Sequence, residues 1–160
     1  MTAENKPPLL EYLKKHGITL EDLVNTALEL FVPHPGVETK EKAAELLREE
    51  FISTLSDVNV SCLETACFLL EEEAKKGLVP GLTADRLTGR PGIIADEILG
   101  MAIASYIAGV KGIFELVRFD QRKPGILSKL GPVVNDAIGG LIAGVSANTY
   151  TKALERRSTS

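Results

Sequence analysis

The chain has 160 residues, which is enough for one domain with a hydrophobic core. Hydrophobic residues make up 44% of the sequence and charged residues 25%, an ordinary globular composition that excludes a disordered or collagen-like chain. The net charge of −4 excludes the strongly basic surface that binds a nucleic-acid backbone, so we expect no nucleic-acid partner.

The first 76 residues have the pattern of four amphipathic helices. Apolar residues recur at helical spacing over 7–15, 19–31, 39–55 and from Asn59 or Ser61 to Lys76. Thr19 followed by Asp22 forms a capping-box pattern at the start of the second helix. The inward face of the fourth helix is expected to consist of Leu63, Ala66, Cys67, Leu70 and Ala74.

Glycine and proline are frequent in residues 77–92, which predicts a loop between an N-terminal helical part, 1–76, and a core part, 93–157. Helical patterns follow over 93–108, 110–118 and from Pro132 to Arg157, with a polar turn at 120–125 and a short helical stretch to Leu130. No long period-two alternation indicates a strand. We therefore expect a single all-α domain, 1–160, of about six to eight helices.

Small residues form a stripe on two of the core helices. Gly100, Ala104 and Ala108 are four residues apart, and so are Gly140, Gly144 and Asn148. Such stripes let helix backbones approach closely, most simply between these two helices, around the acidic residues discussed below. The same stripes could also be satisfied between chains, and on this ground we predict a homodimer.

Two apolar stretches, 92–110 and 131–150, approach the length of a membrane span. Both contain acidic or amide side chains, which favours core helices over transmembrane helices. Residues 1–8 contain no apolar run typical of a signal peptide. Cys62 and Cys67 lack metal or redox spacing and are expected to be buried thiols, so we expect a cytoplasmic protein without a transmembrane span.

Four carboxylates and one amide lie in otherwise apolar, small-residue sequence: Asp96, Glu97, Asp120, Asn135 and Asp136. Carboxylates in such surroundings lose hydration, so they need a cation, a proton or a basic partner. Oxygen ligands without a nearby histidine or cysteine suit a hard cation such as Mg²⁺. These residues are therefore a candidate metal site.

A structural alternative explains the same residues by capping and ion pairing. Asp96 would cap its helix, Glu97 and Asp120 would pair with Arg118, Arg122 or Lys123, and Asp136 would support a helix start. Spacing alone favours neither interpretation. Arg122 and Lys123 could likewise hold a phosphate or be ordinary surface residues.

Residues 92–150 resemble the phosphatidylglycerophosphatase A family in three motifs that keep the family's order. These are Asp96-Glu97-Ile-Leu-Gly100, then Asp120-Gln-Arg-Lys123-Pro124, then Asn135-Asp136 before a small-residue helix. The family has a double acidic pair at the third motif. Asn135 replaces the first acid and removes one negative charge.

The first ninety residues lack the hydrophobic spans of membrane-embedded members and resemble the soluble branch, including its helix start Gly17-Ile-Thr-Leu-Glu-Asp22. The resemblance implies an all-helical fold and Mg²⁺-dependent phosphomonoester hydrolysis, with Mn²⁺ as an alternative metal. The metal ligands it implies are Asp96, Glu97, Asp120 and Asp136, with Asn135 able to contribute a carbonyl oxygen.

In the mechanism that this resemblance implies, Lys123, helped by Arg122, binds the phosphoryl oxygens, and Glu97 or Asp96 takes the proton of the attacking water. The favoured substrate is α-ribazole-5′-phosphate, a soluble metabolite of cobalamin biosynthesis. Phosphatidylglycerophosphate, in phospholipid biosynthesis, is the alternative. A third hypothesis is a helical interaction module that has lost catalysis, with Asn135 as the trace of that loss.

Overall fold

Every element of regular secondary structure in the described residues, 6–89 and 92–160, is helical apart from an isolated bridge between His34 and Val37. The computed structural model therefore confirms the predicted all-α class. Residues 1–5, and residues 90 and 91 of the predicted loop, lie outside the described range. The elements are α1 (Pro8–Lys15), α2 (Leu20–Glu29), α3 (Lys40–Leu55), α4 (Val58–Lys75), α5 (Ala84–Thr88), α6 (Ala95–Ala108), α7 (Val110–Arg122), the 3₁₀ helix η2 (Gly125–Lys129) and α8 (Val134–Ser158).

Side-chain caps fix where the N-terminal helices begin. The predicted capping box of α2 is confirmed: Asp22 N donates to Thr19 Oγ1 (3.1 Å), and Thr19 N donates to Asp22 Oδ2 (2.9 Å). The predicted start of α4 at Asn59 or Ser61 is wrong. The helix begins at Val58 because Asp57 Oδ1 accepts the backbone N–H of Asn59 (2.7 Å).

The predicted inward face of α4 is partly wrong. Cys67 and Ala74 are buried as expected, but Ala66 is exposed, and the other buried residues of the helix are Val60, Glu64, Phe68 and Glu71. The helix is rotated from the predicted orientation because the Phe68 ring packs edge-on against Tyr12 and two carboxylates point inward. Cys62 is exposed, which corrects the expectation that both thiols are buried.

Two predicted loops contain helix. The stretch 77–92 includes α5, which Thr83 caps by accepting the N–H of Arg86 (3.2 Å). The predicted turn at 120–125 is wrong in its first part, because α7 continues to Arg122. The chain leaves α7 through Lys123, which has the left-handed conformation (φ 47°). Asp120 is therefore held on the last turn of a helix.

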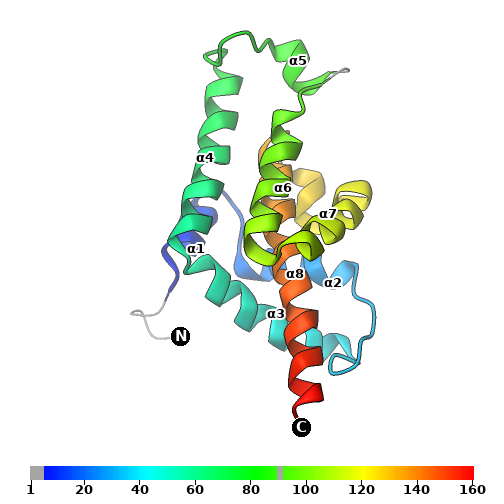
Figure 1. Cartoon of the computed structure of the whole chain (residues 1–160). Coiled ribbons are helices and arrows are strands. Elements are labelled where there is room, and N and C mark those ends of the chain that lie inside the picture. The colour runs from blue at the N-terminus through cyan, green and yellow to red at the C-terminus, as the bar shows by residue number, and fades with distance from the viewer. Residues whose placement is uncertain (1–5, 90–91) are drawn as a thin grey trace.

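The long helix α8 is the centre of the molecule and packs against α2, α3, α4, α6 and α7 (Figure 1). Its glycines let α6 approach closely. A Cβ on Gly100 would lie 2.7 Å from the carbonyl oxygen of Asp136, and a Cβ on Gly140 would overlap the carbonyl oxygen of Gly100. The predicted close packing of the two small-residue stripes is thus confirmed within one chain, and it brings the starts of α6 and α8 together.

In the part of the chain that the structure describes, no helix is both long enough and apolar enough to cross a bilayer.

Candidate functional site

Three helix ends meet at one cavity of about 220 Å³. Because α6 and α7 form a hairpin, the first turn of α6 and the last turn of α7 lie near each other, and α8 begins beside them. The cavity is lined by three carboxylates, one amide and four apolar side chains: Glu97, Asp120, Asp136, Gln121, Met101, Ile113, Leu116 and Val117. The structure therefore brings the acids of all three sequence motifs to one place.

Asp136 is the buried carboxylate of this site, with 7% of its surface exposed. Burial, followed by the hydrogen bond and negative charge of Asp96, raises the pKa of Asp136 to about 7. Lys123 lowers this pKa and Asp120 raises it. Carboxylates on three helices are therefore close enough to repel one another, with one lysine as the opposing charge.

Lys123 links two of the motifs. Its Nζ donates to Asp120 Oδ1 (2.5 Å) and to Asn135 Oδ1 (2.6 Å), so the ammonium group lies between the end of α7 and the start of α8. The left-handed backbone at Lys123 ends α7 and turns the chain toward α8. Asp120 is therefore paired with Lys123, as the structural alternative predicted, and the ammonium group supplies a positive charge within the site.

Asn135 faces Lys123 and the turn before α8. Its Nδ2 donates to the carbonyl oxygens of Gly131 (3.0 Å) and Pro132 (2.9 Å). A carboxylate could accept from Lys123 but could not donate to these two carbonyls. The departure of this sequence from a double acidic pair therefore has a local structural reason. Asn135 does not line the cavity, and Arg122, also predicted here, is exposed and outside its lining.

The capping and pairing alternative is realised in part. Asp120 pairs with Lys123, but Asp96 does not cap α6: its Oδ1 accepts the N–H of the following residue, Glu97 (2.9 Å), and Ile94, the residue before the helix, makes no side-chain cap. Asp96 also lies outside the cavity lining, and Arg118 pairs with Glu115 (2.5 Å) rather than with the site. Within residues 6–89 and 92–160, no three Asp, Glu, His or Cys side chains are arranged as they stand to hold a metal ion. Metal binding at this site thus stays a prediction.

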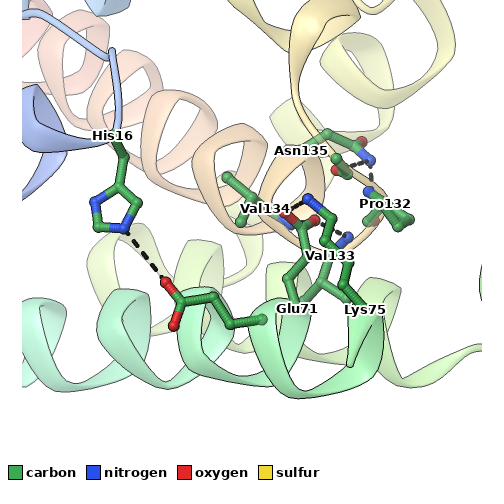
Figure 2. Close-up of polar contacts among 9 residues, drawn as sticks. His16, Glu71, Lys75, Pro132, Val133, Val134 and Asn135 are labelled. Atoms are coloured by element: carbon green, nitrogen blue, oxygen red, sulfur yellow. Dashed lines mark hydrogen bonds and ion pairs between the residues drawn. The ribbon is translucent and has the colours of Figure 1, made fainter. Parts of the chain in front are cut away.

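Glu71 is not among the predicted site residues, yet it holds the start of α8 from another helix (Figure 2). Its Oε1 accepts the N–H groups of Val133 (3.0 Å) and Val134 (3.1 Å), and its Oε2 accepts from Lys75 (3.1 Å). The position of Glu71 on the same side of α4 as Cys67 and Ala74 was the sequence signal that could have indicated a buried carboxylate. Gln121, which lines the cavity, carries no sequence signal beyond its place inside the second motif.

His16, also drawn in Figure 2, pairs with Glu72 at 3.6 Å and packs against the Phe68 ring, and it is not one of the residues that line the cavity.

Solved structures share this fold at low sequence identity. A protein of unknown function from Bacillus stearothermophilus has a TM-score of 0.70 and 21% identity, covering 90% of this chain and 96% of that one. Protein ypjQ from Bacillus subtilis, described under the family model DUF64, has a TM-score of 0.71 and 20% identity, covering 95% and 94%. The low temperature requirement C protein from Listeria monocytogenes has a TM-score of 0.74 and 23% identity, covering 95% of each chain. At these identities the likeness shows the fold alone.

No protein-family model matches the chain. Uncharacterized protein MJ1330 of Methanocaldococcus jannaschii is 35% identical over 118 residues, which are 71% of this chain and 90% of that protein. The chain therefore belongs to the same family as uncharacterized protein MJ1330.

Proposed function

We propose that the protein is a Mg²⁺-dependent phosphomonoester hydrolase, with Mn²⁺ as an alternative metal, and that its active site is the cavity between α6, α7 and α8. One observation carries this proposal: carboxylates from three helices converge beside a lysine at a cavity large enough for a small ligand. The resemblance of the three motifs to the phosphatidylglycerophosphatase A family supports the same activity.

The side chains at the cavity fit a divalent cation. Their ligand atoms are hard carboxylate oxygens. The pKa of Asp136 is raised first by burial and then by the hydrogen bond and negative charge of Asp96, and a cation would relieve that repulsion. Asp96, Glu97, Asp120 and Asp136 would hold the ion. Asn135 would not contact the ion directly in this arrangement. It would orient Lys123, because its Oδ1 accepts a hydrogen bond from that ammonium group. When bound, the ion neutralises charge on the phosphoryl group and lowers the pKa of a bound water.

The residues of the chain would do the remaining chemistry. Lys123 donates to oxygen atoms of Asp120 and Asn135. Its ammonium group would exchange one of these acceptors for a phosphoryl oxygen, which accepts the same kind of hydrogen bond. Arg122, the preceding residue, is exposed and would supply a second positive charge. Glu97 is exposed at the cavity and would take the proton of the attacking water, with Asp96 as the alternative base.

The apolar side chains of the cavity support a substrate with an apolar organic group. Met101, Ile113, Leu116 and Val117 line the cavity together with the carboxylates. A phosphomonoester such as α-ribazole-5′-phosphate, of cobalamin biosynthesis, would place its phosphoryl group near Lys123 and its ring system against the apolar side chains. The proposed setting is the cytoplasm. Phosphatidylglycerophosphate of phospholipid biosynthesis is the alternative substrate.

The proposal is tested by incubating the protein with Mg²⁺ and a panel of phosphomonoesters and measuring phosphate release. The panel contains α-ribazole-5′-phosphate, nucleoside monophosphates, sugar phosphates and phosphatidylglycerophosphate in micelles. Asp136→Asn should lose the activity, and Glu73→Gln should keep it, because Glu73 lies exposed on α4 and, among the described residues, pairs with Lys76 alone. No release from any ester would reject the enzyme and favour the interaction module.

A homodimer also belongs to this proposal. The small-residue stripes from which it was predicted cannot supply the interface, because they pack between α6 and α8 of one chain. Any dimer must use another surface.

A further inference from the structure

We propose that a second copy of this chain docks on the apolar face formed by α6 and α7, next to the candidate active site. Each helix of this hairpin has an exposed stripe at spacings of four and three residues. One stripe consists of Ile94, directly before α6, with Ile98 and Met101 on α6, and the other consists of Val110, Phe114 and Val117 on α7. We call these six residues the hairpin face.

The two stripes point the same way, because both helices bury their opposite sides against α8. On α6 the buried side includes Gly100 and Ile103, which meet Asp136 and Gly140 of α8, and on α7 it includes Leu116, which meets Gly139. Half of the large exposed apolar side chains in the described residues lie on this hairpin face. The patch is therefore an organised surface and not a scatter of single apolar residues.

The size of the hairpin face suits a protein interface. Six large side chains exposed by about half or more present about 600 Å², near the upper limit for a monomer and close to the roughly 800 Å² that each partner buries in a standard interface. Phe114 is 72% exposed and lies in the middle of the α7 stripe. It is the expected anchor of the contact.

The charges around the face favour a second copy over a lipid surface. The segment 98–110 contains no charged residue, and it is flanked by Glu97 at one end and Lys111 at the other. A membrane-docking surface has several lysines and arginines around its apolar residues, whereas here acids stand at one end. Two copies related by a two-fold axis, with their α6 helices antiparallel, would set these uncharged segments against each other.

The hairpin face is continuous with the cavity, since Met101 and Val117 belong to both. A second copy would therefore border the mouth of the candidate site and cover apolar side chains at its rim. The dimer does not depend on phosphatase activity, so it can be tested even if the proposed function fails.

Sedimentation velocity at micromolar concentration tests the proposal on the full chain. The wild type should sediment at twice the 17.2 kDa mass of one chain, and Phe114→Glu should sediment at the mass of one chain. Ile98→Glu repeats the test on α6. Leu69→Glu is the matched control and should remain a dimer, because Leu69 is 51% exposed on α4, which lies on the other side of α6 from α7 (Figure 1). Circular dichroism should show unchanged helix content in all three variants.

A monomeric wild type would overturn the proposal, and so would a Phe114→Glu variant that dimerises like the wild type. Co-sedimentation of a monomeric wild type with vesicles of phosphatidylglycerol and phosphatidylcholine would overturn it in favour of a membrane surface.

Discussion

Replacement of Glu71 by alanine is expected to destabilise the protein strongly, because this buried carboxylate caps α8 from α4. Its Oε1 accepts the backbone N–H groups of Val133 (3.0 Å) and Val134 (3.1 Å). The N-cap residue of α8 makes no side-chain cap of its own. A hydrogen bond to a charged group contributes about 1.5–3 kcal/mol, and a negative charge at a helix start adds roughly 0.3–1 kcal/mol. Because both bonds share one oxygen, we expect Glu71→Ala to cost about 3–4 kcal/mol and Glu71→Gln about 1–2 kcal/mol.

The free energy of unfolding is to be measured by urea denaturation. Lys75→Ala is the matched control, since it removes the ion pair with Glu71 (3.1 Å) and leaves the cap in place. Because Lys75 is largely exposed, its loss should cost less than about 1 kcal/mol. A Glu71→Ala variant no less stable than Lys75→Ala would refute the cap.

A double-mutant cycle sharpens the same prediction. A Cβ on Gly131 would overlap Glu71 Oε1 and lie 2.5 Å from Oε2, and Gly131 does not have a positive φ, so the carboxylate is the nearest obstacle to an alanine there. Gly131→Ala should therefore be destabilising in the wild type and nearly neutral in the Glu71→Ala background. Equal costs in the two backgrounds would show that Glu71 does not occupy this space.

Three further predictions concern other parts of the molecule. Gly140→Ala should lower the free energy of unfolding by about 1–3 kcal/mol, because its Cβ would overlap the Gly100 carbonyl. Gly139→Ala, whose Cβ would have Leu116 Cδ1 as its nearest neighbour at an ordinary contact distance of 3.4 Å, should change it by less than about 1 kcal/mol; equal effects in urea denaturation would contradict the close packing. Within the described residues both carboxylate oxygens of Glu64 are buried without a hydrogen-bond partner, and burial raises its pKa well above the usual range. The unfolded chain releases this proton near pH 4.5 and the folded chain retains it, so stability should fall as pH rises above that value, by at most about 1.4 kcal/mol per pH unit. Asp136, whose pKa is raised to about 7, adds a slope of the same sign below that pH, so Glu64→Gln should reduce the slope measured by denaturation from pH 5 to 8 without abolishing it, and an unchanged slope would contradict the prediction. Lys123→Gly removes a side chain from a left-handed position, so stability should change by less than about 1 kcal/mol while phosphate release falls; retained activity would exclude Lys123 from phosphoryl binding.

The sequence predicted those features that depend on local pattern. Thr19 and Asp22 identify a helix start because their contacts span one turn. The glycine stripe predicts close packing of α6 and α8 because only residues without a large side chain permit it. From that packing follows the meeting of Asp96 with Asp136, which is the core of the candidate site.

Features that depend on contacts between distant segments could not be predicted in this way. The predicted inward face of α4 is partly wrong because Glu64 and Glu71 are buried, whereas a hydrophobicity pattern places carboxylates outside. The cap that Glu71 makes lies more than sixty residues from its partners. Lys123 joins Asp120 to Asn135 only because α7 runs to Arg122 and ends in a left-handed residue, which the expected turn did not include.

The most direct test of the candidate metal site is a calorimetric titration of Mg²⁺, and separately of Mn²⁺, into the wild type and into Asp136→Asn. Our account predicts saturable binding to the wild type and its loss or strong weakening in Asp136→Asn, with Glu73→Gln binding as the wild type does. No saturable heat with the wild type, or equal binding by Asp136→Asn, would contradict a metal site at the meeting of α6, α7 and α8.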